Sequence, residues 1–465
     1  MSTPQKTSAA LDYFQTNFEK YIQELKHLVS IPSVSFTGFD QKKVAECGKE
    51  VQKLFSKIGL ENIQSFVSEH PDRPYIYGDW LNAPGQSTVL LYGHYDVQPP
   101  GSLEKWKSSP FDLSEREGRL FARGSADDKG GLIANLAAID SLLKSTGALP
   151  VNVKVLVEGE EECGSDGLDA FIAKNKKLIQ ADAIVITDAD NYDEKTPGLT
   201  VSLRGLISMS IEVKALKQPV HSGLLGGPLP DAAMALAKIL ATLVDDSGEI
   251  NIPEIKKMVQ PLSDEDRKKI STLPFREDKF RQEAGVLEHT KLRCQNHEIL
   301  ESLWFRPSFS VNCMQASSQT QAGNIIVSSA WARIGLRTVP NIETEKAFAL
   351  IKNHIEKQNI FGFKVEINDV SLGNWWKTKT DHPAFKQMEQ ALEKGWNQPP
   401  VKIGCGGSIP FVQTFSEALG GAPALLIGVC DPSTYAHSEN ESMSLEVWKN
   451  CVKSLIHFLS SFEKK

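Results

Sequence analysis

The sequence contains no long uninterrupted run of apolar residues. A membrane-spanning helix needs about 20 consecutive apolar positions, and no segment provides them. The first ten residues, Met1–Ala10, are polar and lack the apolar stretch of a signal peptide. We therefore expect a cytoplasmic protein without a membrane span.

The sequence also lacks an excess of positive charge and a paired spacing of cysteines. Its formal net charge is -7 at pH 7 and its basic residues do not cluster, so neither nucleic acid nor an anionic membrane is expected as a partner. The seven cysteines are an odd number without paired spacing. This pattern favours reduced thiols over a disulfide framework or a cysteine-type zinc site.

The size and composition are those of a globular protein with more than one domain. At 465 residues the chain exceeds what a single hydrophobic core supports. Hydrophobic residues make up 41% of the sequence, which is enough for two or more cores. Helices are expected over Leu11–Val29, Val44–Ile58, Leu132–Leu143, His382–Trp396 and Leu445–Leu459.

The clearest single element is an apolar run that ends in a histidine and a carboxylate. Ser87–Val97 is rich in β-branched and aromatic residues and is followed by two prolines, which is typical of a buried strand in a parallel sheet. His94 and Asp96 lie two positions apart and project from one face, so that Asp96 could orient the His94 ring toward a metal. A histidine satisfied by a nearby acid is the alternative.

Two adjacent aspartates precede the expected helix over Leu132–Leu143. A single aspartate at the start of a helix is commonly a cap. Asp127 and Asp128 together exceed what a cap requires. An aspartate can also bridge two divalent ions with its two oxygens.

Acidic residues follow two further expected strands. Residues 151–162 combine an apolar strand with four glutamates, and Ala183–Thr187 leads directly into Asp188. Clustered carboxylates at the end of a buried strand repel one another, so a positive group is expected to neutralise them; a solvated acidic turn is the alternative. Ligands bind at the carboxyl edge of open α/β sheets, where these acids and His94 are expected to meet.

The middle of the chain changes character and is expected to form an inserted α/β domain. A helix over Thr344–Gln358 lies between two expected strands, and residues 245–303 are charged and mostly helical in pattern. The expected strands are Ile207–Val213, Asn324–Ala332 and Phe363–Val370, with a further helix over Asp231–Leu243. The expected organisation is a catalytic domain of residues 1–205 and 378–465, interrupted by an inserted domain of residues 206–377.

The last part of the chain carries a second histidine after a strand. Leu425–Val429 is an apolar run, and His437 follows it in a loop of small residues. Upstream of both, Gly404–Pro410 is a glycine-rich loop suited to donating backbone N–H groups to an anion.

Eight motifs in a fixed order resemble the M20 metallopeptidases and, within them, the cytosolic dipeptidase and carnosinase-like branch. They are GHYDVQP (93–99), RGSADDKGG (123–131), EGEEECGS (158–165), ITDAD (186–190), HSGLLGG (221–227), RTVPN (337–341), GGSIP (406–410) and AHSEN (436–440). Each motif is weak alone, but the ordered set is specific. The resemblance extends from about Ile31 to Glu441.

The resemblance implies a site for two divalent ions. The implied ligands are His94, Asp127, Glu162, Asp188 and His437. Asp127 would bridge both ions, with His94 and Asp188 completing one ligand set. Two imidazoles and three carboxylates suit Zn²⁺ or Mn²⁺.

The resemblance also assigns residues around the implied ligands. Glu161 would be the general base that takes a proton from the attacking water, and Asp96 would orient His94. A cis peptide bond is implied between Asp127 and Asp128.

The family fold implied is a zinc-peptidase-like three-layer α/β/α catalytic domain with an inserted α/β lid and dimerisation domain. In a homodimer, His221 would act on the partner subunit's site and, with Asn324, stabilise the oxyanion. The chain reads Asn324-Ile325-Ile326-Val327 there and lacks the proline of the family segment. The implied substrate-binding residues are His221, Asn324, Arg337, which would hold the substrate carboxylate, and the donors Gly407 and Ser408.

One position favours a substrate class. In the family, an aspartate at the position of Asp188 accompanies dipeptidases and aminopeptidases, whereas a glutamate accompanies aminoacylases and carboxypeptidases. The resemblance therefore implies hydrolysis of dipeptides with a free amino terminus. The alternatives are an N-acyl amino acid deacylase or desuccinylase on the same scaffold and an inactive relative that serves as a binding protein. The complete ligand set and Glu161 disfavour the inactive relative.

Overall fold

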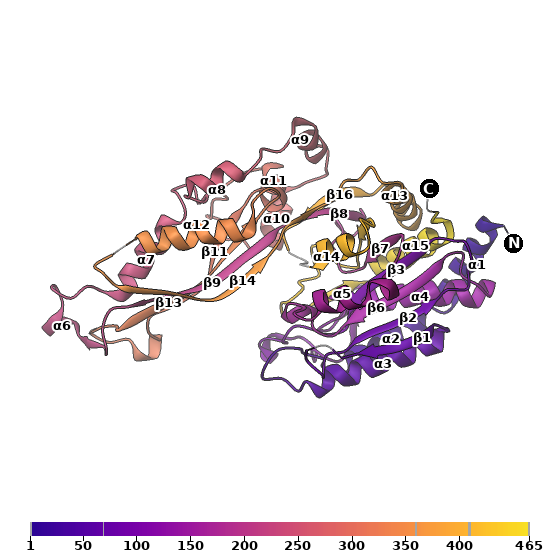
Figure 1. The fold of residues 1–465 in the computed structure, drawn as a ribbon, viewed down its shortest axis with the longest axis horizontal. Coiled ribbons are helices and arrows are strands. Elements are labelled where there is room, and N and C mark those ends of the chain that lie inside the picture. Colours follow the sequence, from indigo (N-terminus) through magenta and orange to yellow (C-terminus); the bar gives the residue numbers. More distant parts are fainter. Residues whose placement is uncertain (1, 68, 359, 408–410, 464–465) are drawn as a thin grey trace. The chain divides into compact units, whose positions relative to one another are not determined.

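The computed structural model describes residues 2–67, 69–358, 360–407 and 411–463. The chain divides into two compact units (Figure 1). Unit 1 combines Met1–Val201, Thr378–Ile403 and Phe411–Lys465, and unit 2 combines Ser202–Lys377 and Gly404–Pro410. The described part of the glycine-rich segment, residues 404–407, groups with unit 2.

The centre of unit 1 is a large mixed sheet with the strand order β1-β2-β6-β3-β7-β17-β8-β15, in which β15 is Trp376–Lys377. Strands β6, β3, β7 and β17 are mutually parallel neighbours. Their bounds are β1 (Glu61–Phe66), β2 (Tyr75–Trp80), β3 (Thr88–His94), β6 (Asn152–Glu158), β7 (Ala183–Ile186), β8 (Gly198–Leu203), β16 (Val401–Cys405), which pairs with β8, and β17 (Ala424–Leu426). The three strands predicted to carry the acids and His94 therefore lie side by side.

Helices cover both faces of this sheet. Leu91 of β3 belongs to the core that contains the buried residues of α4 (Lys129–Thr146) and α15 (Leu445–Ser461), whereas the ring of Tyr92 packs against Phe415 of α14 (Phe411–Ala418). Successive strand residues point to opposite faces, so these helices form separate outer layers. The other helices of unit 1 are α1 (Thr3–Thr16), α2 (Phe18–Val29), α3 (Lys42–Ile58), α5 (Leu168–Ile179) and α13 (Pro383–Trp396). The expected α/β/α arrangement is confirmed.

The prediction of one continuous helix over Leu11–Val29 is wrong, because the structure has two helices there. Helix α1 ends at Thr16, and α2 begins at Phe18. Asn17 between them has non-helical dihedral angles, and its side-chain amide donates to the carbonyl oxygen of Tyr13 at 2.9 Å. An asparagine that satisfies a backbone carbonyl competes with the helical hydrogen bonds and ends the helix.

Unit 2 is built on a four-stranded antiparallel sheet with the order β11-β13-β9-β14. Its strands are β9 (Gly205–Lys214), β11 (Ser308–Gln315), β13 (Ser329–Thr338) and β14 (Lys364–Gly373). Helices α7 (Ala232–Thr242) and α12 (Thr344–Lys357) pack on the face formed by Ile207, Met209, Ile211 and Val213 of β9. Both β13 and β14 are antiparallel to β9 and hence parallel to each other, as the βαβ-like pattern predicted.

Shorter elements complete the described chain. The strand predicted over Asn324–Ala332 divides into β12 (Ile325–Ile326) and the start of β13. Residues 245–303 form short helices, α8 (Pro253–Met258), α9 (Asp264–Ser271), α10 (Glu277–Glu283) and α11 (Glu298–Phe305). The remaining elements used below are β10 (Val220–His221), α6 (Ser222–Leu225) and the small sheet of β4 (Ser114–Arg116), β5 (Arg119–Phe121) and β18 (Ser442–Ser444). No described helix is both long and apolar enough to cross a membrane, and all seven cysteines are free thiols.

Candidate metal centre

Three neighbouring parallel strands deliver polar side chains to one edge of the unit 1 sheet. His94 is the last residue of β3, Asp188 follows β7, and Glu162 lies in the short turn Glu161–Cys163 after β6. Asp127 comes from the loop before α4, and His437 comes from the loop before β18. The structure therefore brings together, within unit 1, the five residues that the motifs single out as ligands.

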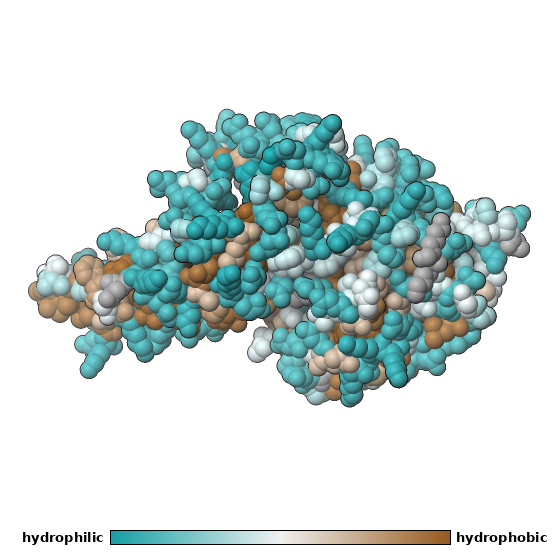
Figure 2. Space-filling view, turned by 45° about the horizontal axis from the view of Figure 1, so that its top comes forward, coloured by the Kyte–Doolittle hydropathy of each residue, from teal (hydrophilic) through white to brown (hydrophobic). Residues whose placement is uncertain are grey.

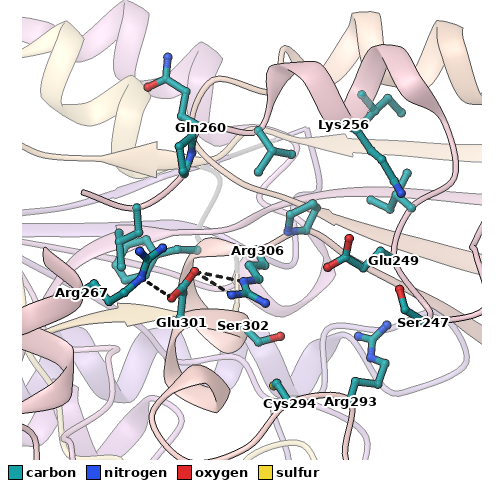
Figure 3. A pocket seen from close by; sticks show the side chains of 17 residues that line it. Ser247, Glu249, Lys256, Gln260, Arg267, Arg293, Cys294, Glu301, Ser302 and Arg306 are labelled. Atoms are coloured by element: carbon teal, nitrogen blue, oxygen red, sulfur yellow. Dashed lines mark hydrogen bonds and ion pairs between the residues drawn. The ribbon is translucent and has the colours of Figure 1, made fainter. Parts of the chain in front are cut away.

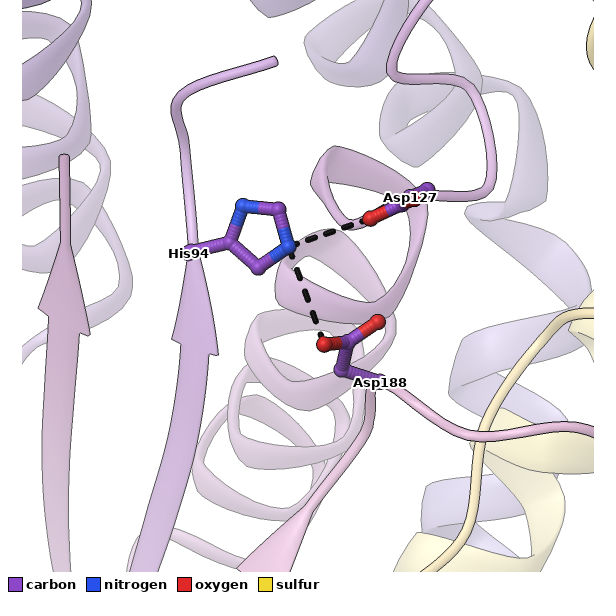
Figure 4. A group of neighbouring side chains, drawn as sticks. All are labelled: His94, Asp127 and Asp188. Atoms are coloured by element: carbon purple, nitrogen blue, oxygen red, sulfur yellow. Dashed lines mark hydrogen bonds and ion pairs between the residues drawn. The ribbon is translucent and has the colours of Figure 1, made fainter. Parts of the chain in front are cut away.

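These residues form two groups that share Asp127. In the first, Nε2 of His94 lies 3.1 Å from Oδ1 of Asp127 and 3.8 Å from Oδ2 of Asp188 (Figure 4). In the second, Nε2 of His437 lies 2.9 Å from Oδ2 of Asp127 and 3.3 Å from Oε2 of Glu162. The two oxygens of Asp127 thus face different imidazoles, as a bridging carboxylate requires.

The spacing within each group fits a metal ion. Four ligands placed about 2.0–2.1 Å from a tetrahedral ion are about 3.3 Å apart, which matches the separations of 2.9–3.8 Å. A hydrogen bond alone explains the arrangement less well, because each imidazole nitrogen faces two carboxylates but carries at most one proton. Imidazole nitrogen and carboxylate oxygen are also the donors that Zn²⁺ and Mn²⁺ accept.

The protonation of the two histidines depends on the same carboxylates. Burial alone would lower the pKa of His94, but Asp127 and Asp96 raise that pKa well above its ordinary value. Asp127 likewise raises the pKa of His437. Burial would raise the pKa of Asp127, but the two histidines hold it below its usual range. Positive charge next to Asp127 therefore stabilises its ionised form.

For the outer two acids, the charge of His94 offsets the effect of burial only in part. Burial raises the pKa of Glu162 and of Asp188 well above the ordinary carboxyl value, and the nearby charge of Asp127 raises both further. Ionising these acids in the protein alone is unfavourable. A divalent cation at each group would supply the missing positive charge.

Asp96 connects the His94 ring to the turn that carries Glu161 and Glu162. Nδ1 of His94 lies 3.1 Å from the Asp96 carbonyl oxygen and 3.4 Å from its Oδ1, so Nδ1–H is donated toward Asp96 and Nε2 is directed at Asp127 and Asp188. The Asp96 carboxylate also accepts hydrogen bonds from the backbone N–H groups of Glu161 and Glu162, at 3.2 Å and 3.1 Å. Asp96 is thus placed to fix both the ring and the turn.

Glu161 lies next to Glu162 in sequence but belongs to neither ligand group. Burial raises the pKa of Glu161 to about 7, and the negative charge of Asp127 contributes. A carboxyl group with a pKa near neutrality can both accept and return a proton at physiological pH.

Two residues support the ligands without having been assigned a role in the site from the sequence. Nε2 of Gln98 donates to Oε2 of Glu162 at 2.6 Å. Asp128 is fully buried, and its Oδ2 accepts the backbone N–H of His94 at 3.2 Å. The peptide bond between Asp127 and Asp128 is cis, as the resemblance implied. Gln98 and Asp128 both lie inside recognised motifs, so motif membership was the available signal.

Unit 2 brings together His221 and Asn324. These residues lie on neighbouring segments, because β10 pairs with β12 and the Ser222 N–H donates to the Asn324 carbonyl oxygen at 2.8 Å. Nδ1 of the exposed His221 accepts the backbone N–H groups of Gly223 and Leu224, at 3.0 Å and 3.2 Å. The ring proton of neutral His221 therefore resides on Nε2, which is available as a donor.

Arg337 on β13 has a second arginine as its neighbour. Arg204 is largely buried and donates to the carbonyl oxygens of Gly406 and Arg306 and to Oγ of Ser308, all neutral acceptors. Burial, followed by the charge of Arg337, lowers the pKa of Arg204 to about 10. Sequence reasoning did not select Arg204.

Of the two predicted donors in the glycine-rich loop, the structure describes only Gly407. The Gly407 N–H is directed at Sγ of Cys405, 3.3 Å away, rather than left free. Ser408 lies outside the described residues.

Unit 2 also contains a cavity of about 440 Å³ that is lined by none of the residues predicted from the sequence to form the site. At its wall, the Glu301 carboxylate lies between two arginines and accepts hydrogen bonds from Nε of Arg267 at 3.1 Å and Nη2 of Arg306 at 2.9 Å (Figure 3). Residues of α8, α9 and α11 contribute to the lining, so the charged segment 245–303 is folded around this space.

Comparison with known proteins gives consistent results. The family model described as peptidase family M20/M25/M40 matches residues 90–461. The Cys-Gly metallodipeptidase DUG1 of Candida albicans is 33% identical, with 96% of this chain and 95% of that protein covered. The Beta-Ala-His dipeptidase of Homo sapiens is 27% identical, with 95% and 91% covered.

Solved structures of the same kind share the fold. The di-peptidase Dug1p of Saccharomyces cerevisiae matches with a TM-score of 0.88 at 27% identity, covering 99% of this chain and 98% of that one. Human carnosine dipeptidase 1 matches with a TM-score of 0.87 at 26% identity, covering 97% and 98%. The chain therefore belongs to peptidase family M20/M25/M40.

Proposed function

We propose that the protein hydrolyses dipeptides with a free amino terminus in a metal-dependent reaction. The observation that carries this proposal is the placement of the two Asp127 oxygens at 3.1 Å and 2.9 Å from two imidazoles that arrive from different parts of unit 1. Relatives named as Cys-Gly and Beta-Ala-His dipeptidases support the substrate class. Asp188, rather than a glutamate, occupies the position that the family resemblance links to dipeptidases.

The five ligand residues would hold two divalent ions, either Zn²⁺ or Mn²⁺. When bound, such ions lower the pKa of a shared water and polarise the scissile carbonyl group. Glu161, which is not a ligand, accepts the water proton on a carboxylate oxygen as the water oxygen attacks the carbonyl carbon. Glu161 then returns that proton to the nitrogen of the leaving amine as the C–N bond breaks.

Arg337 would bind the substrate carboxylate, and His221 and Asn324 would stabilise the oxyanion of the tetrahedral intermediate. The assignment of His221 as a donor is supported by its Nδ1, which already accepts two backbone N–H groups and so leaves the proton on Nε2. A bidentate guanidinium is the usual partner of a terminal carboxylate.

His221 would serve the metal centre of a partner subunit in a homodimer. Around it, Leu224, Leu225 and Ile325 expose 80%, 47% and 41% of their surfaces. Figure 2 shows hydrophobic side chains gathered at the end of unit 2 that bears α6. Exposed apolar clusters of this kind are typical of protein interfaces.

The activity is tested with a panel of dipeptides on metal-stripped protein reconstituted with Zn²⁺, Mn²⁺ or Co²⁺. Each dipeptide is paired with its N-acylated twin, and the metal-free protein is the control. We expect hydrolysis to require metal and to favour the free dipeptides. Preference for the acylated twins would replace this proposal with the deacylase or desuccinylase activity.

A further inference from the structure

Glu441 is a buried carboxylate that binds the backbone around the candidate bridging residue. It precedes β18 and lies four positions after His437. Its side chain is fully buried. Oε1 accepts the N–H groups of Ala126 and Asp127, at 3.1 Å and 3.2 Å, and Oε2 accepts the N–H of Gly124 at 3.1 Å. One side chain thus holds three amides of the loop that ends in Asp127.

Arg123 completes this arrangement. Its guanidinium is almost fully buried, and Nη1 donates to Oε2 of Glu441 at 2.6 Å. Nη2 donates to the carbonyl oxygens of Pro99 and Ser438, at 3.0 Å and 3.2 Å. The ion pair therefore connects three loops: the one after β3, the one before α4, and the one that carries His437.

The loop with His437 needs such anchoring. Tyr435, His437 and Asn440 all have positive φ angles, of 53°, 66° and 64°. Residues other than glycine rarely adopt this conformation, so surrounding contacts must hold it. The Ser438 carbonyl bound by Arg123 lies directly after His437.

Overall stability alone explains this pair poorly. A buried ion pair loses the hydration of both charges, and well-packed apolar residues often stabilise a fold equally well. Directed hydrogen bonds do what apolar packing cannot, because they fix the position of particular backbone atoms. A metal centre requires its ligands to be placed within about 0.5 Å.

We propose that Arg123 and Glu441 are positioning residues that set the distance between Asp127 and His437 and so determine whether both ions bind. The proposal rests on the metal centre proposed above. Neither side chain is among the ligand groups; both act through the loops that they bind. Loss of an outer hydrogen-bonding partner of a metal ligand typically weakens metal affinity by about 10- to 100-fold.

The test compares Glu441→Gln with a matched control, Asp140→Asn. Asp140 is another fully buried carboxylate of unit 1, paired with Lys20 at 2.5 Å, and none of its contacts reaches the ligand residues. Metal-free proteins are titrated with Mn²⁺ by calorimetry, and the thermal midpoint Tm of each variant is measured separately. For Glu441→Gln we expect one of the two ions to bind about 10- to 100-fold more weakly. At saturating metal we expect kcat to fall while KM changes little. For Asp140→Asn we expect a lower Tm with unchanged metal binding.

Arg123→Lys provides a second measurement if Glu441→Gln does not fold. It keeps the charge but loses the second nitrogen that reaches Pro99 and Ser438, and we expect the same selective loss of one ion. Variants that bind both ions as tightly as the unmodified protein, while losing Tm as Asp140→Asn does, would overturn the positioning role. If the unmodified protein bound two ions but cleaved no dipeptide, only the proposed substrate would fail, and the metal titration would still decide this inference.

Discussion

Metal binding is expected to release protons, so the apparent metal affinity of the centre should rise with pH. Each ligand group contains one histidine, and nearby carboxylates raise the pKa of both His94 and His437 above 6.5 in the metal-free protein. An imidazole nitrogen must be deprotonated before it can bind a metal. Each ion should therefore displace about one imidazole proton while the pH lies below the raised pKa values.

The magnitude follows from this stoichiometry. Release of one proton per ion changes the apparent binding constant by about tenfold per pH unit, or about 1.4 kcal/mol, and by about 100-fold for the two ions together. The protons of Glu162 and Asp188, whose pKa values are raised by burial, must also leave. The apparent metal-binding constant should therefore rise at least this steeply with pH in the acidic range. It should stop rising once both histidines and both acids are deprotonated.

The assay is calorimetric titration of the metal-free protein with Mn²⁺ in pairs of buffers that differ in ionisation enthalpy. The difference in heat between the two buffers gives the number of protons released. His437→Gln is the matched variant, because it should lose one bound ion together with the protons that this ion displaces from His437 and Glu162. Metal affinity that does not change with pH, with no proton release, would refute the assignment of the imidazoles as ligands.

Three further perturbations give distinct readouts. Glu161→Gln should lower kcat by about 10²- to 10⁴-fold with metal content unchanged in elemental analysis, and undiminished turnover would remove Glu161 from its role. Glu161→Ala subunits mixed with His221→Ala subunits should regain activity in heterodimers, and confirmed exchange without recovery would contradict action in trans. Trp448→Ala should lower the free energy of unfolding by about 3–5 kcal/mol, measured with urea, because the fully buried indole donates to the Gly130 carbonyl oxygen at 2.9 Å; a loss below about 1 kcal/mol would contradict the packing argument.

The parts of the fold that the sequence predicted are those with strong local patterns. β3 and β7 are continuous apolar runs ended by polar residues, and β6 alternates into its glutamates; in the structure β3 pairs in parallel with both of the others. Strand β11 was missed although residues 308–313 alternate between polar and apolar types. Most of the strand is exposed, and among the described strands it pairs with β13 alone. The break at Asn17 was missed because the apolar spacing continues across it on both sides.

The residues of the candidate site also differ in how far they can be recognised from the sequence. The proposed metal ligands His94 and Asp188 stand at or just after strand ends and are recognisable in the sequence. Residues that hold them in place are recognisable only from contacts across the fold. Glu441 accepts hydrogen bonds from backbone amides more than 300 positions earlier in the chain. The charge of the neighbouring Arg337 contributes to the lowered pKa of Arg204. Charge alone does not distinguish such residues from the surface.

The charge balance of the centre argues for cations independently of any motif. Asp96, Asp127, Glu161, Glu162 and Asp188 would carry five negative charges when ionised, packed around two imidazoles. Desolvation raises the pKa of the last three, so the metal-free protein avoids that charge by holding protons. Two divalent ions would supply four positive charges and leave an excess of one. A cluster that is unfavourable alone but nearly neutral with two ions is expected to gain thermal stability from metal, because ligand binding to the folded state shifts unfolding to higher temperature.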